Sequence, residues 1–371
     1  MLRVLHYVGK MDRGGMETLI MNIYRNIDRS KIQFDFAIHG DRNGDFEDEI
    51  LELGGKFYRF PIMRKNPITY RYAWRKFWKE HANVYTAFHF HTNSLANIIA
   101  FEEAFRSGVR MRIVHSHSSS SNKGKLQSTN IFLHKLHRNR IKRIATNLFA
   151  CSNEASQWLF GGNKLGDKRV LLLKNGVDVN RFKFNQAIRD QMRLNLGLQE
   201  KKVIGHIGSF INVKNHEFLL DIIDNAHKKN PNIRAIFIGD GLLRTHLTTI
   251  VKSRKLESIV QFLGVRKDVS NLLSAMDLFI FPSLYEGLPV SLVEVQANGL
   301  PALVSDSITN NVKINNNIEY ISLHKGTEYW SQRALIRLES DKHSTDVQSL
   351  IEAGFDISDT VDEYVNILQS K

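Results

Sequence analysis

The most constraining feature of this sequence is an alternation of short apolar runs with amphipathic stretches that occurs twice along the chain. Apolar runs of strand length, beginning with residues 2–9, are each followed by a segment whose apolar residues recur with helical spacing. Strands that alternate with helices predict a parallel sheet whose faces are covered by the helices. The series begins again after a polar segment at residues 179–202. We therefore predict an α/β protein that contains two Rossmann-like domains.

The predicted domains divide the chain near its middle. Its 371 residues exceed what one core usually supports, which agrees with two domains of ordinary size. We assign residues 1–185 to the first domain and residues 186–354 to the second. In the final segment, residues 355–371, the apolar Tyr364 and Leu368 share one face of a predicted helix.

Composition and charge narrow the class of protein. Hydrophobic residues make up 42% and charged residues 24% of the chain, as in globular proteins, and no apolar run reaches the ~20 residues that span a bilayer. Cys151 is the single cysteine, so no intrachain disulfide can form, and we expect a cytoplasmic protein. The net charge of +13 predicts an anionic partner, and nucleic acids, phosphorylated metabolites and anionic membranes all fit.

Three loops that follow predicted strands are candidates for ligand binding, because ligands of α/β sheets bind beyond the carboxyl ends of the strands. The first, residues 9–17 (GKMDRGGME), places Gly15 at the start of a helix, where backbone N–H groups can approach an anion closely. An ordinary strand–helix turn is the alternative. The second, residues 208–215 (GSFINVKN), contains Lys214, which could reach a phosphate as a point charge or simply be solvated.

The third loop, within residues 281–301 (FPSLYEGLPVSLVEVQANGLP), carries two glutamates on either side of a helix start. Pro289 suits the first helical position, so Glu286 precedes the helix and Glu294 lies inside it. Carboxylates accept hydrogen bonds from the paired hydroxyls of sugars and riboses, and the backbone N–H groups of residues 287–290 suit a phosphate. The alternative is that Glu286 caps the helix and Glu294 is exposed.

The spacing of these glutamates resembles the E-x7-E motif of the GT-B glycosyltransferases of retaining family 4. The similarity extends along most of the chain, through GGME, LFACSNEASQWLFG, LLLKNGVDVNRF, FIGDGLLRTHL and AGFDI. It implies two Rossmann-like domains that face each other across a cleft, with a C-terminal helix that crosses back to the first domain. The resemblance is strongest to enzymes of capsule and exopolysaccharide synthesis.

The resemblance also implies a donor site for a nucleotide-sugar in the second domain. Glu294 would bind the ribose hydroxyls, Glu286 would hold the donor sugar, and Lys214 would bind the diphosphate. Gly15 would approach that diphosphate from the first domain. The implied donor-binding residues are Gly15, Ser209, Lys214, Leu263, Glu286, Gly287, Leu288, Val290 and Glu294, and the implied catalytic residues are Glu286, His117 and Lys214.

One position departs from the family pattern. The family usually has an arginine where this chain has Ser209, and an arginine fork binds a diphosphate strongly. Arg13 and Arg266 are candidates to replace it. The departure also keeps open a different function, that of a non-catalytic subunit that binds a nucleotide-sugar.

Histidines end two predicted strands of the first domain, in HFHTN (His89, His91) and VHSHSSS (His115, His117). His117 best matches the family histidine that contacts the donor sugar, and His91 is a weaker candidate. Because alternate residues of a strand point the same way, a zinc site is the competing interpretation. We predict no metal and no other cofactor, since no Asp-x-Asp motif is present to hold a metal–diphosphate complex.

We therefore predict a retaining hexosyl- or N-acetylhexosaminyltransferase that moves a sugar from a nucleotide-sugar, with UDP as the expected nucleotide, to a saccharide acceptor in cell-surface polysaccharide assembly. A lipid-linked acceptor would place it at the inner face of the cell membrane. Residues 71–81 interleave cations with Trp74, Phe77 and Trp78, and residues 134–143 form a second cationic segment. Such helices adhere to anionic membranes, although the aromatic residues could instead lie in the core.

A nucleic-acid-binding protein is the remaining alternative, and it follows from the calculated pI of about 9.6 alone. The basic residues are spread along the chain and form no recognition motif. We therefore expect no nucleic-acid partner.

Overall fold

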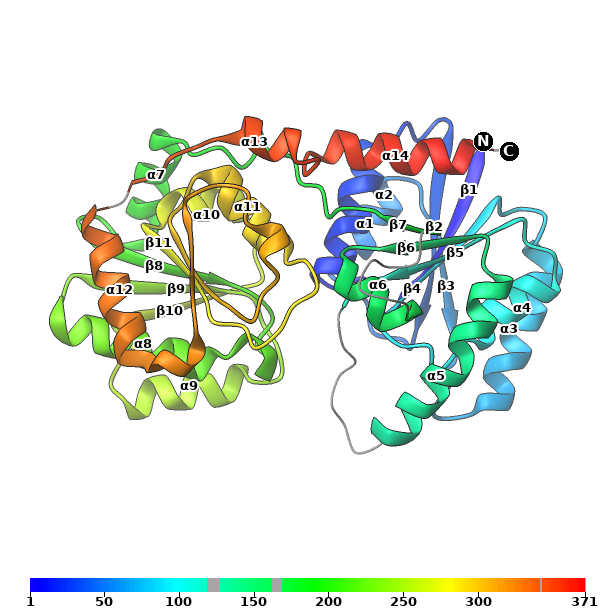
Figure 1. Ribbon diagram of the computed structural model, residues 1–371, viewed down its shortest axis with the longest axis horizontal. Coiled ribbons are helices and arrows are strands. Elements are labelled where there is room, and N and C mark those ends of the chain that lie inside the picture. The colour runs from blue at the N-terminus through cyan, green and yellow to red at the C-terminus, as the bar shows by residue number, and fades with distance from the viewer. Residues whose placement is uncertain (119–126, 162–168, 341, 371) are drawn as a thin grey trace. The chain divides into compact units, whose positions relative to one another are not determined.

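The computed structural model describes residues 1–118, 127–161, 169–340 and 342–370 (Figure 1). The chain divides into two compact units. Unit 1 consists of Met1–Asn175 together with Ile357–Lys371, and unit 2 consists of Gly176–Asp356. Each unit contains a parallel sheet with helices on both faces, as the sequence predicted, and each is described by itself.

Unit 1 is built on a seven-stranded parallel sheet with the order β3-β2-β1-β4-β5-β6-β7. Its strands are β1 (Leu2–Tyr7), β2 (Ile32–His39), β3 (Phe57–Phe60), β4 (Ala87–Thr92), β5 (Met111–Ser116), β6 (Asn147–Ala150) and β7 (Val170–Leu172). The chain order reverses between β1 and β4. Such a switch point is where open α/β sheets place their ligands.

The helices of unit 1 begin at positions that the sequence favours. Its helices are α1 (Gly15–Asn26), α2 (Glu47–Glu52), α3 (Pro67–His81), α4 (Ile99–Arg106), α5 (Gln127–Ile144), α6 (Asn153–Phe160) and α14 (Ile357–Gln369). Asn66 caps α3 by accepting from the backbone N–H groups of Ile68 and Thr69, and Pro67 occupies the first turn, where its missing N–H costs nothing.

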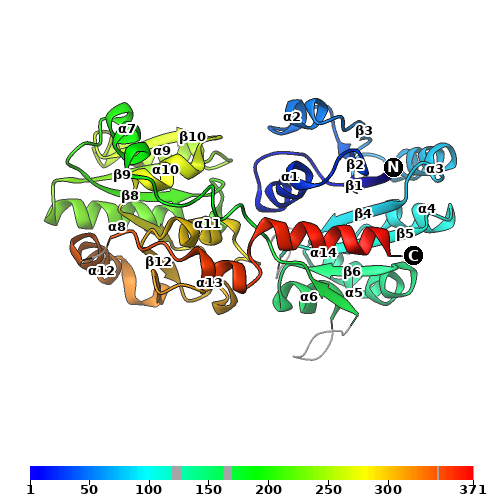
Figure 2. The ribbon, with the colours of Figure 1, turned by 90° about the horizontal axis from the view of Figure 1, so that it is seen from above.

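The C-terminal helix α14 packs in the core of unit 1, as predicted. Val361, Tyr364 and Leu368 are buried in one apolar cluster with residues of α1 and β2. Figure 2 shows α14 beside α1 on the same face of the sheet. Because these apolar residues recur at helical spacing, burying them against the sheet stabilises the helix in this position.

Unit 2 contains a six-stranded parallel sheet with the order β10-β9-β8-β11-β12-β13. Its strands are β8 (Lys202–Ile207), β9 (Ile233–Ile238), β10 (Val260–Gly264), β11 (Leu278–Phe281), β12 (Ala302–Ser305) and β13 (Ile318–Ile321). Its helices are α7 (Gln186–Leu196), α8 (His216–Lys229), α9 (Arg244–Ser253), α10 (Val269–Ala275), α11 (Val290–Asn298), α12 (Gly326–Ser340) and α13 (Val347–Glu352), with short 3-10 turns η1 (Asn212–Lys214), η2 (Asn310–Val312) and η3 (Leu323–Lys325).

The polar segment between the two series of strands belongs to unit 2. Helix α7 packs against α10, and its Arg189 and Arg193 both pair with Asp277. Val177 also forms a bridge to Asp356, which brings together the two points where the chain leaves unit 2. Residues 176–185, which the sequence division assigned to the first domain, therefore lie in unit 2 in this division.

The aromatic residues of segment 71–81 lie in the core of unit 1, which contradicts their predicted role at a membrane surface. Trp74 and Trp78 are fully buried and Phe77 is 7% exposed. Trp74 stacks on Phe60 with a centroid separation of 3.7 Å. The cations of α3 occupy its other face. Within the described ranges, no helix is long and apolar enough to cross a membrane.

Candidate functional site

The candidate site of unit 2 lies at the switch point of its sheet. β8 pairs with both β9 and β11, so the chain order reverses between β8 and β11. The loops that follow these two strands are the second and third loops singled out in the sequence. Two hydrogen bonds join them. The backbone N–H of Leu284 donates to Val213 O at 2.8 Å, and the side-chain amide Nδ2 of Asn215 donates to Pro282 O at 3.2 Å. The topology therefore brings the two loops into contact.

Lys214 and Glu286 form an ion pair between these loops. Lys214 Nζ donates to Glu286 Oε1 at 2.6 Å, and the two side chains are only 15% and 17% exposed. The ammonium also lies 4.7 Å from the centre of the Phe281 ring. A cation and a carboxylate held together at the end of the sheet are suited to exchange partners when an anionic ligand with hydroxyl groups arrives.

Ser209 is half-buried in the loop after β8, and glycines pack tightly around this loop. A Cβ atom on Gly239 would lie 2.1 Å from Gly208 O, and one on Gly241 would lie 2.6 Å from Phe210 O. Gly239 also has φ +135°, which favours glycine. The FIGDG motif is therefore needed to let the loops after β8 and β9 approach each other.

Arg13 and Arg266 are the predicted substitutes for the missing arginine. Within the described residues, no contact places either of them beside Ser209. Arg266 is bound to Asp268 by two hydrogen bonds, and Arg13 belongs to unit 1, where its guanidinium lies over Phe46. The sequence reasoning missed Arg244. Its guanidinium lies 4.7 Å from the Phe262 ring centre and 5.6 Å from that of Phe210, the residue after Ser209.

The start of α11 supplies backbone donors at the same edge of the sheet. Pro289 is its N-cap residue, and the proline side chain makes no capping hydrogen bond. Glu286 lies before this N-cap residue, as the sequence predicted. Gly287, Leu288 and Val290 are buried around the turn. A helix N-terminus, with its positive dipole end, is a favourable position for an anionic group.

Glu294 lies inside α11 and is nearly buried, so the alternative of an exposed helix residue is wrong. It is 9% exposed, and burial raises the pKa of its carboxyl group to about 7, against the opposing effect of Arg181. No other side chain or backbone group within the described residues hydrogen-bonds to this carboxyl. A buried carboxyl without a hydrogen-bond partner in the protein is costly, and it is a candidate for a ligand contact.

Leu263 lies at an irregularity of the edge strand β10. The pairing with β9 shifts between Phe262 and Gly264, which leaves Leu263 outside the regular ladder. A bulge of this kind leaves the extra residue's backbone groups outside strand pairing. The donor-binding role that the resemblance implies for Leu263 is consistent with that geometry.

In unit 1, Gly15 begins α1, after the loop of residues 8–14 that follows β1. A Cβ atom on Gly15 would have no atom within 4 Å, whereas one on Gly14 would lie 2.3 Å from Glu17 Oε2. Burial raises the pKa of Glu17 to about 7, and Asp12 adds to that rise. A side chain at position 14 would require the flexible Glu17 side chain to move, while nothing within the described chain requires glycine at position 15.

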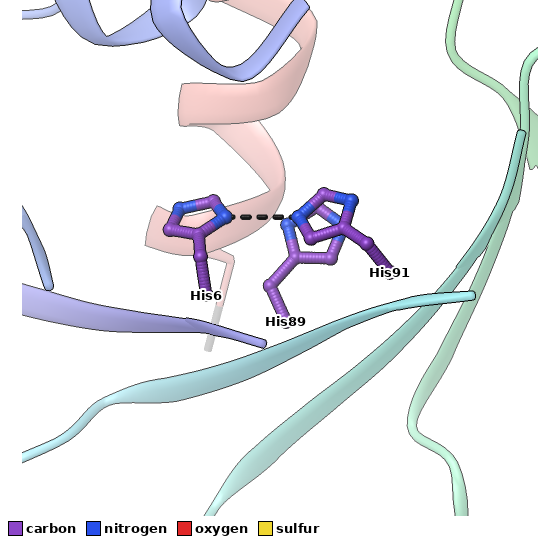
Figure 3. A group of neighbouring side chains, drawn as sticks. All are labelled: His6, His89 and His91. Carbon is purple, nitrogen blue, oxygen red and sulfur yellow. Dashed lines mark hydrogen bonds between the residues drawn. The ribbon is translucent and has the colours of Figure 1, made fainter. Parts of the chain in front are cut away.

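The histidines of unit 1 form a cluster that the sequence revealed only in part. In the sheet, His6 of β1 lies opposite His89 of β4, and His91 lies opposite His115 of β5. Figure 3 shows His6 and His91 turned toward each other beside His89. The predicted His117 joins this cluster, with Nε2 2.8 Å from His91 Nδ1. No signal in the sequence links His6 to the others without the strand register.

Comparisons with known proteins cover both units. Residues 13–181 match the family model Glycosyltransferase Family 4, and residues 188–351 match the model Glycosyl transferases group 1. The chain is 35% identical over 370 residues to a putative glycosyltransferase, EpsF, of Bacillus subtilis, covering 98% of this chain and 96% of that protein. It is 25% identical to the capsular polysaccharide biosynthesis glycosyltransferase CapH of Staphylococcus aureus, covering 100% and 99%.

A solved structure shares the fold along the whole chain. The crystal structure of HepE from Anabaena in complex with UDP and glucose has a TM-score of 0.80 and 18% identity, and 100% of each chain is covered. Another crystal structure of that protein contains UDP-glucose and has a TM-score of 0.79, with the same identity and coverage. At this identity the similarity concerns the fold.

Proposed function

Because this chain is a member of glycosyltransferase family 4 and has the GT-B fold, we propose that it transfers a sugar from a UDP-sugar to a saccharide acceptor, with retention of the anomeric configuration. The transferred group is a hexosyl or N-acetylhexosaminyl residue, and the product is an intermediate of a cell-surface polysaccharide. CapH supports the pathway, and the UDP complexes of HepE support the nucleotide.

The observation that carries the proposal is the carboxyl group of Glu294. It is nearly buried at the carboxyl end of a parallel sheet and has no hydrogen-bond partner within the described part of unit 2. Two adjacent ribose hydroxyls would donate to its two oxygens and satisfy them together. The base then lies against the backbone around Leu263, where the strand pairing is irregular.

The diphosphate would bind where Lys214 and the start of α11 meet. Lys214 now donates to Glu286, so an arriving phosphate oxygen would share or replace that carboxylate as its partner. Glu286 could then accept hydrogen bonds from the hydroxyls of the donor sugar. The backbone N–H groups of Gly287, Leu288 and Val290 would face the same negative charge; Pro289 has no N–H to donate.

The transfer step needs no covalent intermediate in this arrangement. The bond between the anomeric carbon and the diphosphate oxygen breaks while the acceptor oxygen attacks the same face of the sugar. The acceptor's proton passes to the departing phosphate oxygen, so the charges balance. Lys214 and the helix N-terminus stabilise the negative charge that develops on the leaving group, without a metal ion. Glu286 positions the sugar, and Gly15 and His117 are the proposed contributors from unit 1.

The enzyme would reach a lipid-linked acceptor at a membrane surface, and α5 is the helix that could bind that surface. Phe132 and Leu136 are 66% and 60% exposed on this helix. Lys135 and Arg143 are exposed on the same face, because residues three, four and eleven positions apart are neighbours on a helix. Exposed apolar groups beside cations favour adhesion to anionic lipid at the cytoplasmic face.

Binding of nucleotides to the purified full chain tests the donor assignment. We expect UDP and one or more UDP-sugars to raise the melting temperature, while GDP and ADP do not. Glu294→Ala should abolish the UDP-dependent shift, and Glu257→Ala, which removes an exposed carboxylate of the same unit, should leave it unchanged. An intact shift in Glu294→Ala would remove this residue from the donor site.

A non-catalytic nucleotide-sugar-binding subunit is the second candidate, and Ser209 is the observation that favours it. Release of UDP from the bound UDP-sugar in the presence of membrane acceptor separates the two functions. Stoichiometric binding with no release above the uncatalysed rate would favour the subunit.

A further inference from the structure

The five histidines at the carboxyl end of the unit 1 sheet contain one continuous hydrogen-bonded chain. His6 Nδ1 lies 2.9 Å from His91 Nε2, and His91 Nδ1 lies 2.8 Å from His117 Nε2. His6 and His91 are 1% and 5% exposed, whereas His117 is half-buried at the end of the chain of contacts. Both ring nitrogens of His91 are therefore occupied by other imidazoles.

Stacking holds the rings of this chain in place. His91 stacks on His89 with a centroid separation of 3.9 Å, and His117 lies 4.0 Å from His115. His89 is fixed in turn by a contact of 2.9 Å between its Nδ1 and the hydroxyl of Tyr364 on α14. The orientation of His117 is therefore determined by residues from three strands and the C-terminal helix.

The three hydrogen-bonded imidazoles, those of His6, His91 and His117, are neutral. Burial lowers the pKa of His6 and of His117 to about 3, and burial together with the neighbouring histidines lowers that of His91 well below its ordinary value. A neutral imidazole carries one N–H and one lone pair. Each ring that donates through one nitrogen must then accept through the other, so the tautomers of the three rings are coupled.

His6, at the buried end of this row of hydrogen bonds, selects one of the two possible donor-to-acceptor directions. His6 Nε2 has no partner within the described residues and lies in the core. An unpartnered buried N–H group is rarer in proteins than an unpartnered acceptor. The favoured direction leaves a lone pair at His6 Nε2, so that His6 Nδ1 donates to His91 and His91 Nδ1 donates to His117 Nε2. The proton of His117 is then on Nδ1.

A metal ion is a weaker explanation of the same cluster. Two groups, His6 with His89 and His91, and His91 with His115 and His117, have one nitrogen each within 4.8 Å of the others. Zinc–nitrogen bonds of about 2.0–2.1 Å in a tetrahedral site hold ligand nitrogens about 3.3 Å apart and aimed at one point. Here the nitrogens of His6 and His91 are 2.9 Å apart and face each other (Figure 3).

We propose that His91, supported by His6, is a positioning residue that holds His117 in one orientation with its proton on Nδ1, so that His117 presents an N–H donor to its ligand. The consequence for transfer rests on the proposed function, in which His117 contacts an oxygen of the donor sugar. The tautomer itself does not depend on that function. Loss of His91 should leave His117 free to exchange tautomers and to rotate.

Nitrogen NMR of the full chain labelled with ¹⁵N-histidine tests the tautomer directly. In the wild type we expect His117 to carry its proton on Nδ1 in a single state. His91→Phe should give averaged His117 nitrogen signals, while His91→Asn, whose side-chain amide can still donate to His117 Nε2, should keep them close to wild type. His115→Phe is the matched control, because the His115 ring lies against His117 but makes no hydrogen bond within the described chain.

Kinetics and metal analysis complete the test. With UDP binding within about twofold of wild type, His91→Phe should lower the turnover of transfer about ten- to a hundredfold, and His91→Asn should recover much of it. A wild-type His117 protonated on Nε2, an unchanged tautomer in His91→Phe, or one tightly held zinc per chain would each overturn the proposal. If wild type neither binds UDP nor transfers sugar while the His117 tautomer is as expected, the proposed function fails and the tautomer assignment stands.

Discussion

Replacing Glu294 with glutamine should stabilise unit 2 and at the same time abolish nucleotide binding. Glu294 is 9% exposed, and burial raises the pKa of its carboxyl group from the ordinary 4.5 to about 7. The folded protein therefore holds this proton more tightly than the unfolded chain does. The free energy of unfolding consequently falls as the pH rises from the unfolded-state pKa to the folded-state pKa, and the loss is complete above it.

The magnitude follows from the two pKa values. The ionisable carboxyl lowers the free energy of unfolding by about 1 kcal/mol at pH 5 and by about 3 kcal/mol at pH 8. Glu294→Gln keeps the shape of the side chain and removes the charge. The free energy of unfolding of the variant, relative to wild type, should therefore rise by about 2 kcal/mol between pH 5 and pH 8. Any cost of burying the amide is the same at both pH values and cancels.

Urea unfolding of the full chain at pH 5 and pH 8, monitored by hydrogen exchange of the β8 and β11 amides, measures the difference in free energy of unfolding between variant and wild type within unit 2. Glu257→Gln, which removes an exposed carboxylate of the same unit, is the matched control and should show no such pH-dependent gain. The UDP-dependent rise in melting temperature should be lost only in Glu294→Gln. An equal stability difference at both pH values would refute the burial argument, and a stabilised variant that still responds to UDP would refute the ribose assignment.

Three further predictions concern the other loops and α5. Ser209→Arg should raise UDP affinity about tenfold, because it restores a guanidinium near the diphosphate, and isothermal titration that finds equal or weaker binding would contradict this. Gly15→Ala should leave the free energy of unfolding within about 1 kcal/mol of wild type, because open space surrounds the added Cβ atom. It should reduce sugar transfer, because the proposed ligand approaches the backbone at this position. Unchanged transfer would remove Gly15 from the site. The double variant Phe132→Ser, Leu136→Ser should lose binding to anionic vesicles in a flotation assay. The control Leu194→Ser, which removes a 60% exposed leucine of unit 2, should keep it. Equal binding by wild type, the double variant and the control would exclude α5 as the membrane contact.

Local patterns were sufficient to predict the α/β class and the position of the third loop. The strand before Pro282 and the helix after Pro289 are encoded by neighbouring residues, so the placement of Glu286 before the helix and Glu294 within it needed no long-range information. The C-terminal helix was also predictable, because its apolar residues recur with helical spacing. Such signals act over one or two turns of chain and are written in the sequence itself.

Local patterns failed where packing between distant segments decided the outcome. Trp74 and Trp78 alternate with cations as in a membrane-binding helix, but only the fold shows that they face the core of unit 1. Helix α11 is buried on nearly all sides, although it contains Glu294, Gln296 and Asn298, and the burial that raises the pKa of Glu294 depends on elements far away in the chain.

The sequence by itself determined many of the strands and helices and the loops that end them, because each of these depends on the residues within a few positions; the segment with β13 and α12 carried no clear pattern. Tertiary structure alone decided which loops meet and which side chains share a face. The pairing of β1 with β4 places His6 beside His89 and within reach of His91, and the reversal of strand order at β8 and β11 brings Lys214 to Glu286. Strand register is a property of the whole sheet, so residues 72 or 85 positions apart become partners only when the sheet forms.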